Sequence, residues 1–174
     1  MARRMWCCVA VLGAVLAACG GSTKGTSAPA TSSTVVTTTT VARTTTSAPV
    51  DYGKTYLALA KPLNAAGGAF NAAIGKLGSN PTSASVQTVC TPFADALTTF
   101  DSKVLRVNWP ASAATDVKAL VTADGALVGD LSSAQSQTVL SASSWESALS
   151  SDASKSSTAA NIVRADLGLG PPRS

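Results

Sequence analysis

The sequence of 174 residues contains no histidine and a single glutamate, Glu146. Histidine is the commonest general base in enzymes and the commonest metal ligand in proteins. Any acid–base chemistry would therefore depend on Asp, Lys, Tyr, Ser or Cys side chains alone. These absences argue against an enzyme, and we expect no catalytic residue, no cofactor and no resident metal ion.

A surplus of basic charge is also missing from the part of the chain that can fold. The whole sequence has 13 Lys and Arg residues and 9 Asp and Glu residues. All the acidic residues lie at Asp51 or later, whereas Arg3, Arg4, Lys24 and Arg43 precede it, so basic and acidic residues balance from there on. Nucleic-acid binding proteins carry excess positive charge facing the phosphates. We therefore expect no nucleic-acid partner.

The first apolar run is too short to cross a membrane. It reads MWCCVAVLGAVLAA and spans residues 5–18. As a helix it would rise about 21 Å, at ~1.5 Å per residue, whereas the hydrocarbon core of a bilayer is about 30 Å thick. A basic segment, here Arg3 and Arg4, followed by such a run is typical of a secretory signal peptide. The paired arginines also raise the twin-arginine export route, but the strong apolar run favours general secretion.

The end of this run, LAAC at residues 16–19, resembles the lipobox of bacterial lipoproteins. In such proteins the cysteine thiol takes a diacylglyceryl group, and cleavage leaves the lipidated cysteine at the new N-terminus. The resemblance implies that residues 1–18 are a removable signal peptide and that Cys19 is lipidated. Several acyl chains, such as palmitate, meet the requirement for more than one hydrophobic signal in stable anchoring. We expect a lipid anchor in the cell membrane, on its extracytoplasmic face; a plain secretory cleavage site is the alternative.

Residues 19–50 are predicted to form a disordered tether. More than half of residues 22–47 are Ser or Thr, with scattered Pro and Ala and no hydrophobic periodicity. Such a segment buries too little apolar surface to offset the entropy of ordering its backbone. Its composition also makes it a candidate for O-glycosylation.

Residues 51–170 show helical periodicity and are predicted to form an all-α, up-down-up-down four-helix bundle. Apolar residues recur there at alternating steps of three and four, which keeps one stripe of each helix facing its partners. Turn-forming residues separate the segments at GSNP (78–81), NWP (108–110) and SQT (136–138), and Gly168 is expected to end the last helix. Residues 171–174 would form a short tail. Pro62 and Pro92 fall inside predicted helices and should kink or split them, since proline costs ~3 kcal/mol in a helix interior.

Several stretches of this domain resemble a family of uncharacterised actinobacterial, chiefly mycobacterial, lipoproteins. They read YGKTYLALAKPLNAA, VLRVNWP, DVKALVTADGALVGDL and AANIVRADLGL. The resemblance covers nearly all of residues 51–170. It implies a secreted helical domain on a lipid tether, and it assigns a functional role to none of the domain's residues.

Asp124 breaks the apolar stripe of its own helix. When the chain folds back at the following turn, Asp152 comes to lie on the next helix at the same height as Asp124. The other turns bring Asn64 and the flank of Asp95 to about that level. We therefore predict a polar layer in the middle of the bundle, formed by Asp124, Asp152 and Asn64. Metal sites in bundles use Glu and Glu-x-x-His, both absent here, which favours a layer that fixes the helix register. A cation or ligand site and a proton-sharing catalytic pair are the alternatives.

Four further residues are predicted to gather at one end of the bundle, where both ends of the domain and the second loop meet. They are Tyr52, Tyr56, Trp109 and Leu167. An aromatic cap on the core is the structural interpretation of this cluster. A shallow apolar site facing the membrane is the functional one.

Cys90 is the only cysteine of the predicted domain, so the domain can form no internal disulfide bond. Cys7 and Cys8 belong to the predicted signal peptide. Cys90 shares an apolar stripe with Val86 and Phe93. We therefore predict a buried, unreactive thiol in preference to a reactive one.

Two functions fit these expectations. The first is a lipid-anchored, non-enzymatic module of the cell envelope that binds a protein, cell-wall or lipid partner. The alternative is a carrier of a small apolar ligand or lipid inside the bundle. A cavity above ~300 Å³ would favour the carrier, whereas a solid core would favour the module.

Overall fold

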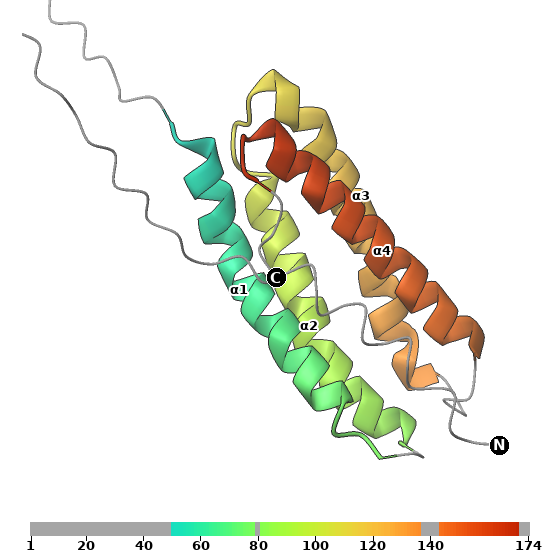
Figure 1. Cartoon of the computed structure of the whole chain (residues 1–174). Helices are drawn as coiled ribbons and strands as arrows, with labels where there is room; N and C mark the ends of the chain where they lie inside the picture. The colour runs from blue at the N-terminus through green and yellow to red at the C-terminus, as the bar shows by residue number, and fades with distance from the viewer. Residues whose placement is uncertain (1–49, 79–80, 137–142, 171–174) are drawn as a thin grey trace, which may run out of the picture.

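A computed structural model of the chain describes residues 50–78, 81–136 and 143–170. The elements are α1 (Tyr52–Ile74), α2 (Ser83–Val104), α3 (Ala111–Ser133), the short 3₁₀ turn η2 (Ala134–Ser136) and α4 (Ser143–Asp166). Successive helices run in opposite directions, which gives an up-down-up-down four-helix bundle (Figure 1). The predicted all-α bundle is confirmed, and no strand occurs within the described ranges.

The predicted signal peptide, the lipidation site at Cys19, the tether up to residue 49 and the tail at residues 171–174 lie outside the described residues. Across the ranges that are described, every helix is too short or too polar to cross a membrane.

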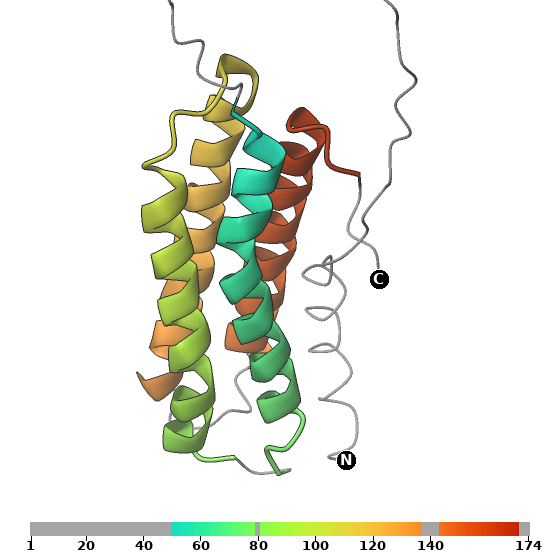
Figure 2. The ribbon, with the colours of Figure 1, turned by 90° about the vertical axis from the view of Figure 1, so that its left-hand side faces the viewer.

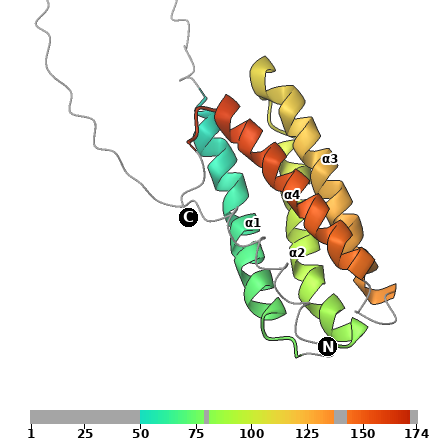
Figure 3. The same cartoon turned by 45° about the vertical axis from the view of Figure 1, so that its right-hand side comes forward.

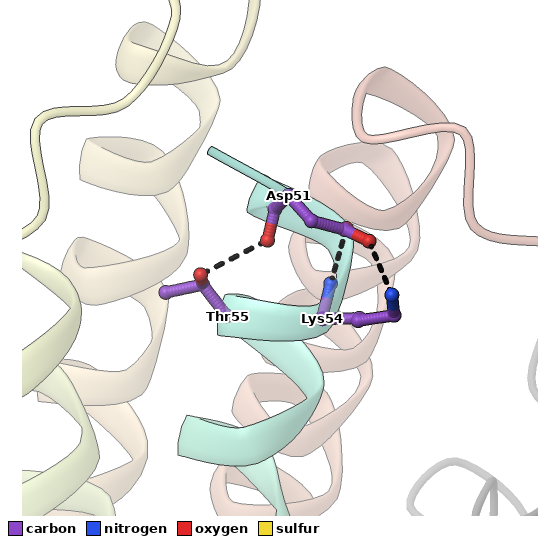
Figure 4. A network of polar contacts seen from close by, with 3 residues as sticks. All are labelled: Asp51, Lys54 and Thr55. Atoms are coloured by element: carbon purple, nitrogen blue, oxygen red, sulfur yellow. Dashed lines mark hydrogen bonds and ion pairs between the residues drawn. The ribbon is translucent and has the colours of Figure 1, made fainter. Parts of the chain in front are cut away.

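Side-chain caps explain where the first two helices begin. The Asp51 carboxylate accepts a hydrogen bond from the Lys54 backbone N–H at 2.9 Å, and the Asp51 carbonyl accepts one from the Thr55 hydroxyl at 3.0 Å (Figure 4). The Lys54 ammonium lies 3.1 Å from the other carboxylate oxygen of Asp51. Thr82 caps α2 in the same way, accepting from the Ser85 N–H at 3.1 Å. These bonds satisfy N–H groups that have no partner inside the helix.

Gly168 ends α4, as the sequence predicts. Its φ of 68° is left-handed, which glycine adopts without steric cost. The Leu169 N–H donates to the Arg164 carbonyl at 2.8 Å, and the Gly168 N–H donates to the Ala165 carbonyl at 3.0 Å. This pair of bonds is the Schellman motif, which satisfies the last carbonyls of the helix.

Pro62 and Pro92 lie inside α1 and α2, and both helices continue through them. The alternative in which a proline splits its helix is therefore wrong for both. Each proline is on the exposed side of its helix. The carbonyl that loses its hydrogen bond can be hydrated there, while the opposite face still packs in the core.

Three pairs of neighbouring helices pack closely: α1 on α2, α2 on α3 and α3 on α4. The fourth pair, α1 and α4, is in much looser contact. At one end of the bundle the residues that follow α4 reach α1: a Cβ added to Gly53 would lie 3.1 Å from Cδ2 of Leu169 and 3.5 Å from the Leu167 carbonyl oxygen. From that end the two helices diverge, as Figure 3 shows; in Figure 2, α1 lies in front of α4. The bundle is therefore closed on three sides and open along the fourth.

Candidate functional site

A pocket of about 120 Å³ lies between α1 and α4, where these helices diverge. Its deep wall is apolar and comes from the first three helices, including Tyr56, Leu63, Phe93, Leu97, Phe100 and Leu120. Its outer wall is formed by small residues of α4, namely Ser150, Ala153, Ser154, Ser156, Ser157 and Ala160. Ser154 is exposed, so the pocket opens to solvent along this helix.

The small residues of α4 explain why the pocket exists. Between Leu149 and Val163, both buried, this helix has no large apolar side chain on the face toward the bundle. Ala and Ser side chains are too short to fill the space between α4 and α1. Helices pack tightly only where their side chains interdigitate, so the gap in the stripe leaves a gap in the core.

Asp124 of α3 lines this pocket and is only 1% exposed, the one charged residue among the buried described residues. The Ser156 hydroxyl of α4 donates a hydrogen bond of 2.5 Å to its Oδ1. Its Oδ2 is buried and has no hydrogen-bond partner. A buried polar atom without a partner is costly, typically by ~1–3 kcal/mol, and needs a physical explanation.

A second carboxyl group supplies part of that explanation. Asp101 of α2 is half-buried, and its Oδ1 also lacks a hydrogen-bond partner. Burial, followed by the charge of Asp124, raises the pKa of Asp101 to about 8. Burial also raises the pKa of Asp124, against the lowering effects of hydrogen bonds from Ser156 and Asp101. The two carboxyl groups therefore hold a proton between them at neutral pH.

Two other ionisable groups reach the pocket. Burial raises the pKa of Tyr56 to about 12; the charge of Asp124 adds to this effect and that of Arg164 opposes it. Arg164 donates from Nη2 to the Gly170 carbonyl at 2.8 Å, while its buried Nε has no partner. The pocket is thus lined by one buried carboxyl group, that of Asp124, and by one guanidinium near the end where α4 stops; Asp101 lies behind Asp124 and does not line it.

The structure places only part of the predicted polar layer in this pocket. Asn64 and Asp124 both line it, whereas Asp152 does not. Asp152 instead accepts a bond of 2.6 Å from the Lys155 ammonium. Ser156, one turn later on α4, faces Asp124 instead. Because η2 continues directly from α3, the chain turns back later than expected, and a later residue of α4 lies level with Asp124.

Asp101, which pairs with Asp124, is the residue that the sequence interpretation missed. Asp95, which was expected near this level on the same helix, is exposed. A signal for Asp101 was present, since it lies four residues after the buried Leu97 and next to the buried Phe100. Residues three and four positions apart share one face of a helix.

The three aromatic residues of the predicted end cluster lie together at one end of the bundle. The ring centroids of Tyr52 and Trp109 are 5.9 Å apart, and those of Tyr56 and Trp109 are 6.4 Å apart. Trp109 donates from Nε1 to the Val104 carbonyl at 2.7 Å. Tyr56 and Trp109 are buried, whereas Tyr52 and Leu167 pack against the core while partly exposed. The arrangement is a packed aromatic end of the core.

Cys90 is fully buried, as its stripe position predicts. Burial raises the pKa of its thiol to about 11. Because the thiolate is the reactive form, this environment makes the residue unreactive.

Among the described residues, no three His, Cys, Asp or Glu side chains are grouped so that they could hold a metal ion. The chain matches no protein-family model, no curated protein and no solved structure. The candidate site therefore has to be interpreted from its own chemistry.

Proposed function

We propose that this chain is a lipid-anchored, extracytoplasmic lipoprotein whose bundle is a non-enzymatic binding module of the cell envelope. In this proposal the pocket between α1 and α4 takes a small organic ligand. The observation that carries it is the buried carboxyl group of Asp124 in a pocket whose deep wall is otherwise mostly apolar. A few polar groups set in an apolar pocket are the usual composition of a small-molecule site.

The energetic cost of this arrangement supports a role beyond folding. The apolar side chains that line the pocket lack packing partners on one side, so they forfeit the contacts that a filled core would make. A larger residue in place of Ala153 or Ala160 would occupy that space, and an apolar residue at Asp124 would remove a buried carboxyl group. Features that a sequence could easily improve for stability are typical of functional sites.

The volume of the pocket limits the ligand. Typical sites for drug-sized ligands begin at ~300 Å³, whereas an engineered cavity of ~150 Å³ holds a benzene molecule. A pocket of about 120 Å³ therefore fits a single ring or a short alkyl chain. The carrier alternative, with a lipid inside the bundle, needs a larger space than this pocket offers.

The attachment to the membrane is supported by the sequence of the N-terminal region. The LAAC motif follows a basic segment and a short apolar run in the order found in bacterial lipoproteins. The Ser/Thr-rich segment that follows would hold the bundle away from the membrane surface, as a coil of ~30 residues reaches about 30 Å. The pocket would then be open to small molecules of the envelope.

Filling the pocket tests the proposal. In Ala153→Leu and Ala160→Leu, added methyl groups should occupy the space between α4 and α1, raise the melting temperature and abolish the binding of small aromatic fragments detected by ligand-observed NMR. Ala148→Leu is the matched control, because Ala148 is exposed on the same helix and does not line the pocket. Fragment binding that is equal in the control and the filled variants would contradict the proposal.

A further inference from the structure

One end of the pocket is lined by a cation. Arg164, near the end of α4, lines the pocket together with Tyr56, near the start of α1. Both belong to the aromatic end of the bundle, where the ring centroids of Tyr56 and Trp109 are 6.4 Å apart. From there the deep wall continues with apolar residues such as Leu97 and Phe93. A charged group at one end of an apolar pocket favours a ligand that has one charged group and an apolar body.

Arg164 has more hydrogen-bond donors than its described neighbours use. A guanidinium group carries five N–H donors. Within the described ranges its side chain makes one hydrogen bond, from Nη2 to the Gly170 carbonyl, and its buried Nε has no partner. No carboxylate of these ranges lies within ion-pair distance of the guanidinium. Cationic groups that leave water are normally paired with an anion, so this end of the pocket has capacity for one.

Tyr56 supplies a second donor beside Arg164. Burial raises the pKa of Tyr56 to about 12, so its hydroxyl keeps its proton at neutral pH. The positive charge of Arg164 lowers the pKa of the same hydroxyl, which shows that the two groups lie close together. A carboxylate has two acceptor oxygens and can accept from a guanidinium and a hydroxyl at once.

We infer that this pocket binds a small monocarboxylate. Its carboxylate group lies against Arg164 and the Tyr56 hydroxyl, and its apolar body lies along Leu63, Leu97 and Phe93. The inference rests on the proposed function and specifies its ligand class. Arg164 is the one cationic side chain that lines the pocket, which matches the single charge of a carboxylate better than the higher charge of a phosphate.

Asp124 limits the pH range in which such an anion binds well. The ionisable groups that face the anion are Tyr56 from α1, Asp124 from α3 and Arg164 from α4, and Asp101 of α2 lies behind Asp124. At neutral pH the two Asp residues share a proton. As the pH rises through the Asp101 pKa of about 8, this proton leaves and a second negative charge appears near the pocket. A carboxylate should therefore bind more weakly above this pH.

The test compares benzoate with benzyl alcohol in titrations of the full-length chain, followed by ligand-observed NMR at pH 6 and pH 9. The two probes share a ring and differ in charge, and a carboxylic acid is ionised at both pH values. At pH 6 we expect benzoate to bind at least about tenfold more tightly than benzyl alcohol, because only benzoate accepts charge-assisted hydrogen bonds. Benzoate affinity should fall at least about threefold at pH 9, whereas benzyl alcohol affinity should not change.

Substitution of Arg164 identifies the residue that holds the carboxylate. Arg164→Gln should weaken benzoate binding at pH 6 about tenfold or more and leave benzyl alcohol binding unchanged. Arg106→Gln is the matched control, because it removes the same charge from an exposed residue that does not line the pocket. Tyr56→Phe removes only the hydroxyl and should weaken benzoate binding to a smaller extent. Circular dichroism establishes that each variant is folded; if Arg164→Gln fails to fold, Tyr56→Phe carries the comparison.

The other outcomes separate this inference from the proposed function. Equal binding of both probes, or an equal loss of benzoate binding in Arg164→Gln and Arg106→Gln, would overturn the carboxylate assignment and leave a small-molecule pocket. Absence of binding by either probe would overturn both. Displacement of benzoate by an equal concentration of inorganic phosphate would replace the carboxylate with a phosphate group.

Discussion

At the scale of single residues, the Asp101–Asp124 pair makes the stability of the bundle depend on pH. Both pKa values are raised in the folded protein, chiefly by burial, whereas an exposed Asp in the unfolded chain titrates near 3.8. Between pH 3.8 and the Asp101 value of about 8, the folded chain holds a proton that the unfolded chain has released. The stabilisation is complete below this window and is lost as the pH rises through it.

We therefore expect the melting temperature of the wild type to fall between pH 5 and pH 9. The free energy of unfolding should drop by at most about 1.4 kcal/mol per pH unit, and by less here because Asp101 is half-exposed and solvent screens it. In Asp124→Asn the residue at this position no longer shares a proton with Asp101, so the melting temperature should depend less on pH. This variant should also be more stable than the wild type at pH 9. Asp152→Asn should keep the wild-type dependence. Parallel melting curves for the wild type and Asp124→Asn would show that the pair is not coupled.

The sequence predicted one member of this pair and missed the other. Asp124 was identifiable because a charged residue interrupts a regular stripe of leucines and valines. Asp101 was missed because it lies beside the apolar stripe of its helix and not in it. A residue in such a position is buried or exposed according to the tilt of the neighbouring helix. Asp152 was placed with Asp124 by reflection through a turn, and the extra length of η2 put Ser156 there instead. The apolar periodicity shows on which face of its helix a residue lies, but the height of that residue along the bundle depends on the geometry of the loops.

At the scale of elements, α4 explains the pocket. The other helices carry a large apolar residue at nearly every inward turn, whereas α4 has Ala and Ser between Leu149 and Val163. The sequence therefore showed that this helix had little to pack with. It could not show whether α1 would move in to close the gap or stay apart. The structure answers this: α4 packs closely on α3 and leaves the α1 side open.

The end of α4 is held by Gly168, and this can be tested by substitution. Nothing lies within 4 Å of a Cβ added at Gly168, so Gly168→Ala causes no clash and acts only through its positive φ. It should lower the free energy of unfolding by about 1 kcal/mol, the cost of a left-handed residue that has a Cβ. Gly170→Ala is the matched control, because its surroundings are equally open and its φ is not positive. Thermal melting that gives equal losses for both variants would show that the φ of Gly168 is not what matters.

At the scale of the whole molecule, the start of α1 and the end of α4 meet at the aromatic end of the bundle. Val50, the first residue described, precedes α1 there. The predicted tether would therefore join the bundle at this end, while the pocket opens along the side between α1 and α4. The all-α fold followed from periodicity because each helix buries its own stripe. The opening on one side was not predictable, since it depends on how four helices share one core.

The proposed membrane attachment can be tested at Cys19. Cys19→Ala removes the only thiol in the lipobox position, so we expect no incorporation of labelled palmitate and loss of the protein from the membrane fraction. The melting temperature of the bundle should not change, because its core is formed by residues from Tyr56 to Val163. Cys7→Ala is the matched control: this thiol lies in the predicted signal peptide, twelve positions earlier, and its removal should leave palmitate labelling intact. Labelling that persists in Cys19→Ala, or is lost equally in Cys7→Ala, would contradict a lipid anchor at Cys19.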